Sequence, residues 1–281
     1  MQEVGPGIFF TDSYPGTTVG AIILTGGIIF IDAPLHAEDA EIWKLALLNR
    51  SRGAIYKLLV NLDAHPDRTA GAKAMDVSAI AQQKAAERIS KHAEVFRGQL
   101  PPRGSEWEKY PDMVGVRWTH PNLTYTEQIS FHWGDPTVVM EHHPGPCPGA
   151  SWVIVPEHQV VFVGDAALED VPPFLAEADI PQWLETLDVL TGSDCKDFTI
   201  ISGRGGIISP DVIKKQRKSL RKLHRRIEKL AKKNAPPEAV SDLATTILDD
   251  FSSQKEESEF HLKRLRHGLY QYYMRHYVSE T

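Results

Sequence analysis

The sequence predicts an α/β protein whose last quarter is helical. Short apolar runs alternate with segments of helical spacing up to residue 209, and Gly or Pro separates many of them. Only helical spacing follows Pro210. Alternation of this kind is typical of α/β domains, in which helices cover a sheet. We therefore expect an α/β domain over residues 1–209 and a helical cap or oligomerisation region over residues 210–281.

The composition is that of an ordinary globular protein. The chain has 281 residues, of which 42% are hydrophobic and 24% charged. A core of this size needs no disulfide or structural metal, and Cys147 and Cys195 lack the spacing of a zinc site. No apolar run reaches the length of a membrane span, and no signal peptide is visible. We expect a cytoplasmic protein with two free thiols.

The first 209 residues are expected to alternate strands and helices. Short apolar runs bounded by turn residues predict strands, and apolar residues spaced by three or four predict helices. The expected strands cover residues 7–11, 19–24, 28–31, 56–60, 78–81, 123–126, 129–133, 137–142, 151–155, 159–163 and 198–202. The expected helices cover residues 37–50, a short segment from about 70, 84–96 and 181–191. Residues 97–121 are expected to form a long irregular excursion of the kind that often carries function.

The region after Pro210 is expected to form three helices, over about 210–233, 240–251 and 256–277. The first has an apolar seam with steps of three and four residues, which suits packing against a neighbouring helix or a homodimer. Residues 211–233 also carry a net charge of +9, so the rest of the chain carries −15 within the total of −6. This basic helix could attract nucleic acid or an anionic membrane surface. The seam consists of Ile213, Gln216, Leu220, Leu223, Ile227 and Leu230.

Four polar segments stand where predicted strands end. They are Asp63-x-His65-x-Asp67-Arg68, the turn at residues 142–149, Gly164-Asp165 and Gly203-Arg204-Gly205. In this order the segments resemble the metallo-β-lactamase-fold metallohydrolases, whose pieces are His-x-His-x-Asp-His, His-x-Pro-Gly-His-x-x-Gly, Gly-Asp and Gly-His-Gly. The resemblance covers about residues 7–207. It implies a four-layer αββα metallo-β-lactamase-like sandwich with the site along one edge of both sheets.

The resemblance also implies two metal positions, and this chain departs from the family pattern at both. The first position of the family takes three histidines, where this chain has Asp63, His65 and Pro146. The second takes an aspartate and two histidines, where this chain has Asp67, Arg68 and Arg204. The carboxylate that bridges the two metals corresponds to Asp165.

Arginine chemistry argues against a two-metal centre. A guanidinium stays protonated and cannot ligate a metal, whereas Arg68 and Arg204 could neutralise Asp67 and Asp165 directly. We expect no metal at the second position. At the first, Asp63, His65 and Asp165 could hold a single Zn, Mn or Fe ion, and His142, His143 or Cys147 could complete the set. The alternative is that Asp63 and His65 hydrogen-bond to each other and to nearby backbone.

Three functional hypotheses follow. The first is a hydrolase-like protein that acts on a small anionic ester, thioester, lactone or phosphoester with at most one metal. In it Asp67 or Asp165 would orient or deprotonate a water, Arg68 and Arg204 would bind an anion, and His65 would transfer a proton. The second is a non-catalytic binding or scaffold protein that has lost its metals. The third is a nucleic-acid or membrane-surface binder that uses the basic helix.

Two further segments could contribute to a cleft. Residues 172–175 follow Gly164-Asp165 and could line its mouth, although a covered loop is the more common use of such a segment. The indole rings of Trp107, Trp118 and Trp133 could form an aromatic wall, although core packing is the more common use of tryptophan.

Overall fold

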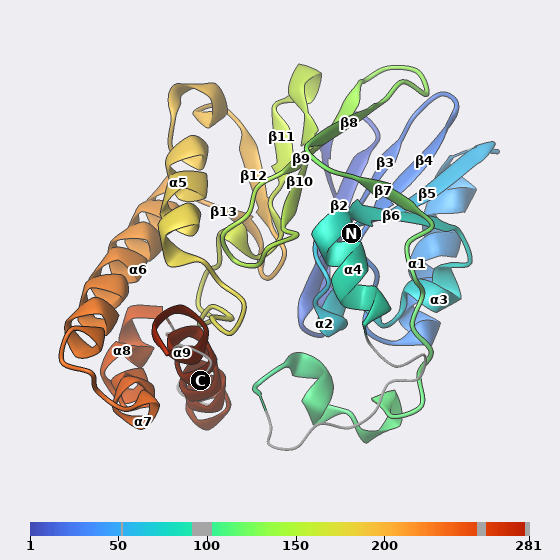
Figure 1. The fold of residues 1–281 in the computed structure, drawn as a ribbon. Helices are drawn as coiled ribbons and strands as arrows, with labels where there is room; N and C mark the ends of the chain where they lie inside the picture. Colours follow the sequence, from blue (N-terminus) through green and yellow to red (C-terminus); the bar gives the residue numbers. More distant parts are fainter. Residues whose placement is uncertain (52, 92–102, 252–256, 279–281) are drawn as a thin grey trace.

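The molecule is built from two β-sheets packed face to face, with helices on both outer faces (Figure 1). The computed structural model describes residues 1–51, 53–91, 103–251 and 257–278. Among these residues, no helix combines the length and the hydropathy that crossing a bilayer requires.

The first sheet has seven strands in sequence order, β1 to β7. Neighbours from β1 to β4 are antiparallel, whereas those from β4 to β7 are parallel. The parallel part follows from the helices that separate these strands in the chain, because a parallel pair needs a crossover connection. The strands are β1 (Gln2–Gly5), β2 (Ile8–Tyr14), β3 (Thr17–Ile23), β4 (Gly27–Ile31), β5 (Tyr56–Asn61), β6 (Ser78–Gln82) and β7 (Leu123–Tyr125).

The second sheet has the strand order β13-β12-β11-β10-β9-β8. Only the pair β11–β12 is parallel, because α5 (Ile180–Leu190) connects these two strands. The strands are β8 (Gln128–Phe131), β9 (Val138–His142), β10 (Ser151–Val155), β11 (Val160–Phe162), β12 (Thr199–Ser202) and β13 (Gly206–Ile208).

Three buried clusters confirm the expected four layers. One lies between the sheets and joins side chains such as Ile29 and Val153. A second packs α1 (Ala37–Arg50) and α3 (Ala72–Met75) on the outer face of the first sheet through Trp43 and Met75. The third packs α5 and α6 (Pro210–Ala231) on the outer face of the second sheet, with Trp183 and Leu220 among its members.

The last three helices extend this third cluster. They are α7 (Pro237–Ser241), α8 (Leu243–Phe251) and α9 (Ser258–Tyr277), and they contribute Val240, Ile247 and Leu269 to it. The predicted seam of α6 is buried except at Leu230, which is half-buried. Its polar member Gln216 donates to the carbonyl of Ala166 and accepts from the N–H of Leu168. The helical region therefore shares one core with the sandwich.

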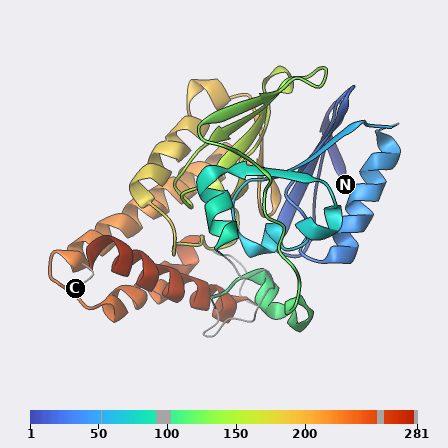
Figure 2. The same cartoon turned by 45° about the vertical axis from the view of Figure 1, so that its right-hand side comes forward.

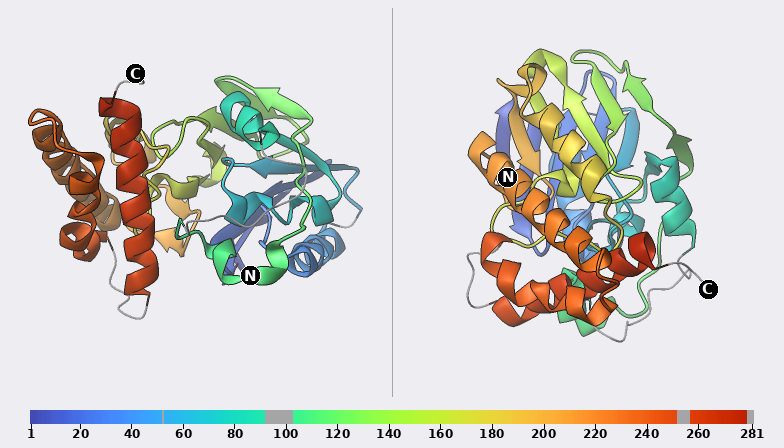
Figure 3. Two further views of the ribbon diagram at one scale, coloured as in Figure 1. Left: turned by 60° about the horizontal axis from the view of Figure 1, so that its bottom comes forward. Right: turned by 60° about the vertical axis from the view of Figure 1, so that its left-hand side comes forward.

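Helix α9 also runs beside the excursion that connects β6 to β7 (Figures 2 and 3). Arg264 donates to the carbonyl of Gly104 at 2.8 Å, and Lys109 pairs with Glu257 at 2.7 Å. The excursion contains two short 3-10 helices, η1 (Glu106–Lys109) and η2 (Pro111–Met113). Trp107 and Trp118 are buried within it, and Trp107 also lines the cavity described below.

The site edge is defined by the carboxyl ends of parallel strands. Asp32 follows β4, the 61–69 loop follows β5, Asp165 follows β11 and Arg204 follows β12. In open parallel sheets, ligands bind outside this end of the strands. The two sheets present these ends to the same side of the sandwich, and the backbone N–H of Thr18 in β3 joins them by donating to the carbonyl of Gly203 at 2.7 Å.

Several element boundaries differ from those predicted. Strands β1 and β13 were not expected, because one is polar and the other is a three-residue strand at the glycine loop. The short helix expected from about residue 70 is split into α2 (Pro66–Thr69) and α3. Helix α4 (Gln83–Ser90) ends before the predicted residue 96, and residues 92–96 lie outside the described part of the chain. The third C-terminal helix begins at Ser258, and residue 256, near its predicted start, lies outside the described part of the chain.

Gly20 allows the ring of Phe162 on the second sheet to pack directly against the backbone of β3 on the first sheet. A Cβ on Gly20 in β3 would lie 2.4 Å from a ring carbon of Phe162 in β11. We expect Gly20→Ala to lower the free energy of unfolding by about 1–3 kcal/mol, the usual cost of overpacking a core. Urea unfolding measures it, and adding Phe162→Leu should restore part of the loss. An unchanged midpoint for Gly20→Ala would show that the sheets separate freely here.

Candidate functional site

The 61–69 loop is shaped by its own hydrogen bonds. His65 is the N-cap of α2, and its Nδ1 accepts from the backbone N–H of Asp67 at 3.2 Å. Pro66 occupies the first turn, where its missing N–H costs nothing. The carboxylate of Asp63 accepts from the N–H of His65 at 2.8 Å. The hydrogen bonds within the loop therefore position His65 and Asp67 without any contact from the second sheet.

Arg68 is fully buried among three carboxylates. Its Nη2 donates to Asp165 across the sheet interface, Nη1 lies 3.5 Å from Asp32, and Nε lies 3.5 Å from Asp63. Gly203 leaves space for the guanidinium, because a Cβ there would lie 2.4 Å from Nη1 of Arg68.

Arg204 makes the reciprocal connection from the second sheet. Its Nη1 donates to Asp67 at 2.8 Å and to the carbonyl of Gly16, and its Nε donates to Asp165 at 3.1 Å. Nη2 lies 3.2 Å from Nδ1 of His65. Because Nδ1 accepts from the Asp67 N–H and faces an arginine donor, it carries no proton, and the neutral ring holds its proton on Nε2.

Asp67 and Asp165 are stabilised as anions. Burial alone would raise the pKa of each, but arginines on both sides of Asp165, and Arg204 with the backbone N–H of Trp107 beside Asp67, hold their pKa values below the usual range. Asp67 also accepts the backbone N–H groups of Glu106 and Trp107 at 3.1 and 3.0 Å. The excursion is therefore anchored to the same network.

The four aspartate side chains outnumber the two arginines, and one of these aspartates, Asp32, keeps its proton. Burial raises the pKa of Asp32 to about 8, with Arg68 opposing the shift and Asp63 adding to it. Burial also raises the pKa of Asp63. A protonated Asp32 reduces the surplus of negative charge around Arg68.

His65 is kept neutral. Burial lowers its pKa to about 3, although Asp67 opposes the shift, and Arg204 lowers the pKa further. Its ring lies 4.3 Å from that of Phe174.

The donor set does not fit a metal ion. Asp63, His65 and Asp165 lie in one cluster, as predicted, but the Asp165 oxygens accept from Arg68 and Arg204, and Nδ1 of His65 faces two N–H donors. Within the described ranges, no group of three His, Cys, Asp or Glu side chains could hold a metal. A divalent cation placed here would also meet two fixed guanidinium charges.

Of the three residues that could have completed a metal site, the two histidines are engaged elsewhere. The Nε2 atom of His142 lies 2.8 Å from the carbonyl of Pro148. His143 contacts Glu141 at 3.1 Å and stacks on Trp152 with the ring centroids 3.5 Å apart. Cys147 lines the cavity next to the network, and burial, with Asp63 adding to it, raises the pKa of its thiol well above the ordinary value.

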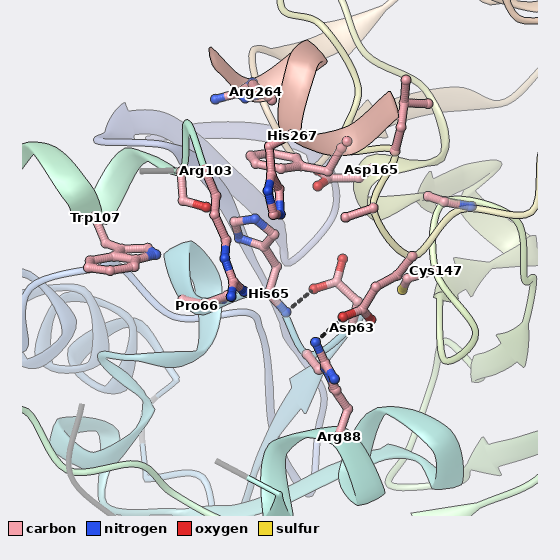
Figure 4. A pocket seen from close by; sticks show the side chains of 18 residues that line it. Asp63, His65, Pro66, Arg88, Arg103, Trp107, Cys147, Asp165, Arg264 and His267 are labelled. Atoms are coloured by element: carbon pink, nitrogen blue, oxygen red, sulfur yellow. Dashed lines mark hydrogen bonds and ion pairs between the residues drawn. The ribbon is translucent and has the colours of Figure 1, made fainter. Parts of the chain in front are cut away.

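A cavity of about 130 Å³ opens beside this network. Figure 4 shows His65, Arg103 and His267 pointing toward one another around it. Phe174 and Leu175 line it, so this part of the segment 172–175 contributes to the cavity and is not only a covered loop. The other lining residues include Asp63, Pro66, Trp107, Cys147, Asp165 and Arg264.

Arg264 was not predicted as a site residue. It is buried on α9, stacks on Phe174 at 4.1 Å, and donates to the carbonyls of Gly104 and Pro172. Burial, with Arg204 nearby, lowers its pKa to about 10, so it stays protonated at neutral pH. The guanidinium of Arg204 lies 4.8 Å from the centre of the same Phe174 ring. The sequence signal of Arg264 is a lone arginine on the apolar side of a helix.

Asp32 and Arg103 were missed as well. Asp32 directly follows the apolar strand β4 and has a left-handed φ of 57°. Its position after a buried strand is the sequence feature that could have marked it as a site residue. Arg103 lies in the excursion, where the sequence has no periodicity that could place it. Within the described residues the guanidinium of Arg103 has no carboxylate partner, and neither has that of Arg264.

Comparison with known proteins places this geometry in a family. The sequence model described as the metallo-beta-lactamase superfamily matches residues 64–204, which is half of the chain. No curated protein matched the chain by sequence.

Solved structures of similar fold include a sec-alkylsulfatase and β-lactamases. The stereoselective inverting sec-alkylsulfatase Pisa1 from Pseudomonas sp. has a TM-score of 0.67 and 15% identity, over 98% of this chain and 49% of that chain. A metallo-beta-lactamase from Pontibacter korlensis has a TM-score of 0.58 and 14% identity, over 78% of this chain and 97% of its own. The DIM-1 metallo-beta-lactamase has the same TM-score and 18% identity, over 78% of this chain and 94% of its own. This chain therefore spans about half the length of the sulfatase.

The protonated state of Asp32 predicts a pH effect on stability. Folded Asp32 keeps its proton up to a pKa of about 8, whereas an unfolded aspartate releases it near pH 4. The folded state binds the extra proton between these values, so the contribution of this group to stability falls as the pH rises toward 8. Asp32→Asn removes this titration, and Asn tolerates the left-handed backbone.

We expect Asp32→Asn to gain about 1 kcal/mol in free energy of unfolding relative to the parent for each pH unit between about 6 and 8. Urea unfolding across this range measures the difference, in which the histidine titrations common to both proteins cancel. Asp76→Asn, at an exposed aspartate with φ of 48°, controls for the amide on left-handed backbone. A constant difference across the range would mean that Asp32 is ionised.

The ligand chemistry also predicts the response to zinc. Protein treated with chelator and then with Zn²⁺ is expected to keep its melting temperature and to retain substoichiometric metal by mass spectrometry. In Arg68→His/Arg204→His the two cations are replaced by imidazoles, and this variant is expected to retain more zinc than the parent. One tightly held zinc per parent chain would contradict the fit described above.

Proposed function

The chain belongs to the metallo-beta-lactamase superfamily, and we propose that it binds a small organic anion at this edge of the sandwich without a metal cofactor. The observation that carries the proposal is a pair of arginines, Arg103 and Arg264, that line the cavity without a carboxylate partner in the described part of the chain. Buried cations in proteins are ordinarily paired, so Arg264 favours an anionic guest.

The network beneath the cavity supports a metal-independent mode of binding. Asp67 and Asp165, two of the carboxylates that a metal would need, are already paired with Arg68 and Arg204. They therefore present little free negative charge to repel an anion. His65, with its remaining proton on Nε2, adds a neutral donor at the cavity wall.

The size and the walls of the cavity indicate the kind of anion. A cavity of about 130 Å³ accepts a group roughly as large as benzene. Pro66, Trp107, Phe174 and Leu175 give it apolar walls beside the arginines. A carboxylate or sulfate ester with a compact apolar substituent matches both features.

The superfamily fold is that of hydrolases, so turnover of such a ligand is measured alongside its binding. One structural neighbour is a sec-alkylsulfatase, and a secondary alkyl sulfate is therefore a suitable probe. If turnover occurs, His65 is placed to donate a hydrogen bond from its Nε2–H, and the arginines are placed to stabilise a developing anion.

We expect benzoate and a short secondary alkyl sulfate to bind the parent in calorimetric titrations. Arg264→Gln and Arg103→Gln should each weaken binding by about tenfold, because each removes a charge-assisted contact. Arg266→Gln, on the exposed side of the same helix, is the matched control and should bind like the parent. Sulfate release measured in parallel separates binding from hydrolysis. Equal affinity in all four proteins would refute the assignment of the cavity.

A further inference from the structure

The cavity continues outward into a larger groove. The groove has a volume of about 640 Å³ and shares Arg88, Arg103, Glu177 and His267 with the inner cavity. Its walls are α4 with Lys91 on one side and α9 with Arg275 on the other. This outer groove consists of Lys84, Glu87, Arg88, Lys91, Arg103, Pro148, Ala176, Glu177, His267, Gln271 and Arg275.

The outer groove carries more cations than it can neutralise. Arg88 pairs with Glu177, and Glu87 accepts from Gln83. In the described ranges, the ammonium and guanidinium groups of Lys84, Lys91 and Arg103 have no ion-pair partner. Arg275 donates to the carbonyl of Ala178. Like charges therefore face one another from two elements across a concave surface, and this arrangement favours a guest with several negative charges.

We propose that the outer groove binds a phosphate-type group. The ligand of this protein is then a small phosphorylated molecule whose phosphate lies in the groove and whose other, compact end lies in the inner cavity. A phosphate monoester carries roughly two negative charges at neutral pH and several acceptor oxygens. Lysines and arginines that approach from two walls can all contact a phosphate group, whereas a single carboxylate has too few oxygens for them. This inference rests on the proposed function for the inner end of the ligand.

The shape of the groove selects a small molecule. The outer groove leads into the inner cavity, whose floor is formed by Asp63, His65 and Asp165. A polymer such as nucleic acid needs a surface along which it can continue in both directions. The basic face of α6 is such a surface, and the outer groove is not.

Inorganic diphosphate is the probe for the groove, and benzoate is the probe for the cavity. The first variant is Lys84→Ala/Lys91→Ala, in which two exposed side chains of the groove lose their charge. Its matched control is Lys218→Ala/Lys229→Ala, which removes the same charge from the exposed face of α6. Calorimetry measures each probe alone and diphosphate in the presence of saturating benzoate.

We expect the groove variant to bind diphosphate at least about tenfold more weakly than the parent and the α6 control. Saturating benzoate should not displace diphosphate. Failure of benzoate alone to bind would overturn the proposed function of the inner cavity and leave the diphosphate result to decide the groove. Absent diphosphate binding, equal binding by both lysine variants, or displacement by benzoate would overturn the inference about the groove.

Discussion

Two buried arginines, each reaching from one sheet into the carboxylates of the other, fasten the site edge of this sandwich. Arg68 comes from the first sheet and contacts Asp165 of the second, and Arg204 comes from the second and contacts Asp67 of the first. Each guanidinium is enclosed, so neither can be withdrawn without leaving buried carboxylates unpaired, a change that ordinarily costs several kcal/mol. The strand ends, the 61–69 loop and the glycine loop therefore keep one fixed arrangement.

The same network explains why the C-terminal helices belong to the site. Phe174 contacts both Arg204 of the sandwich and Arg264 of α9, and Arg264 in turn holds the carbonyls of Gly104 and Pro172. The excursion is tied to the network from its other side, because Asp67 accepts from Glu106 and Trp107. The helices thus form one wall of the cavity. In keeping with this, the match to the sulfatase covers 98% of this chain and so includes most of the helical region.

The sequence predicted what depends on local pattern and missed what depends on tertiary packing. The seam of α6 follows from spacing alone. Spacing also predicted helix α1, but Ile42 and Leu45, on which that prediction rested, are exposed, and the buried face of the helix consists of Ala40, Trp43 and Leu47. The family resemblance of four polar segments predicted the sandwich and the cluster of Asp67, Asp165, Arg68 and Arg204. Asp32 could not be assigned, because its role requires β4 and β5 to end side by side. Arg103 and Arg264 could not be assigned either, because an arginine in a loop or on a helix shows no chemistry until packing brings it to a cavity.

Replacing a metal with side chains changes what the site can do. A guanidinium supplies positive charge and directional donors but no vacant coordination position, so it neutralises carboxylates without activating a bound water. Its charge is also smaller than that of a divalent ion, so four aspartates exceed two arginines, and the proton that Asp32 retains reduces this surplus of negative charge. Arg103 and Arg264 line the cavity and have no carboxylate partner among the described residues. An anion bound beside them would add negative charge to this edge, whereas a metal centre would add positive charge.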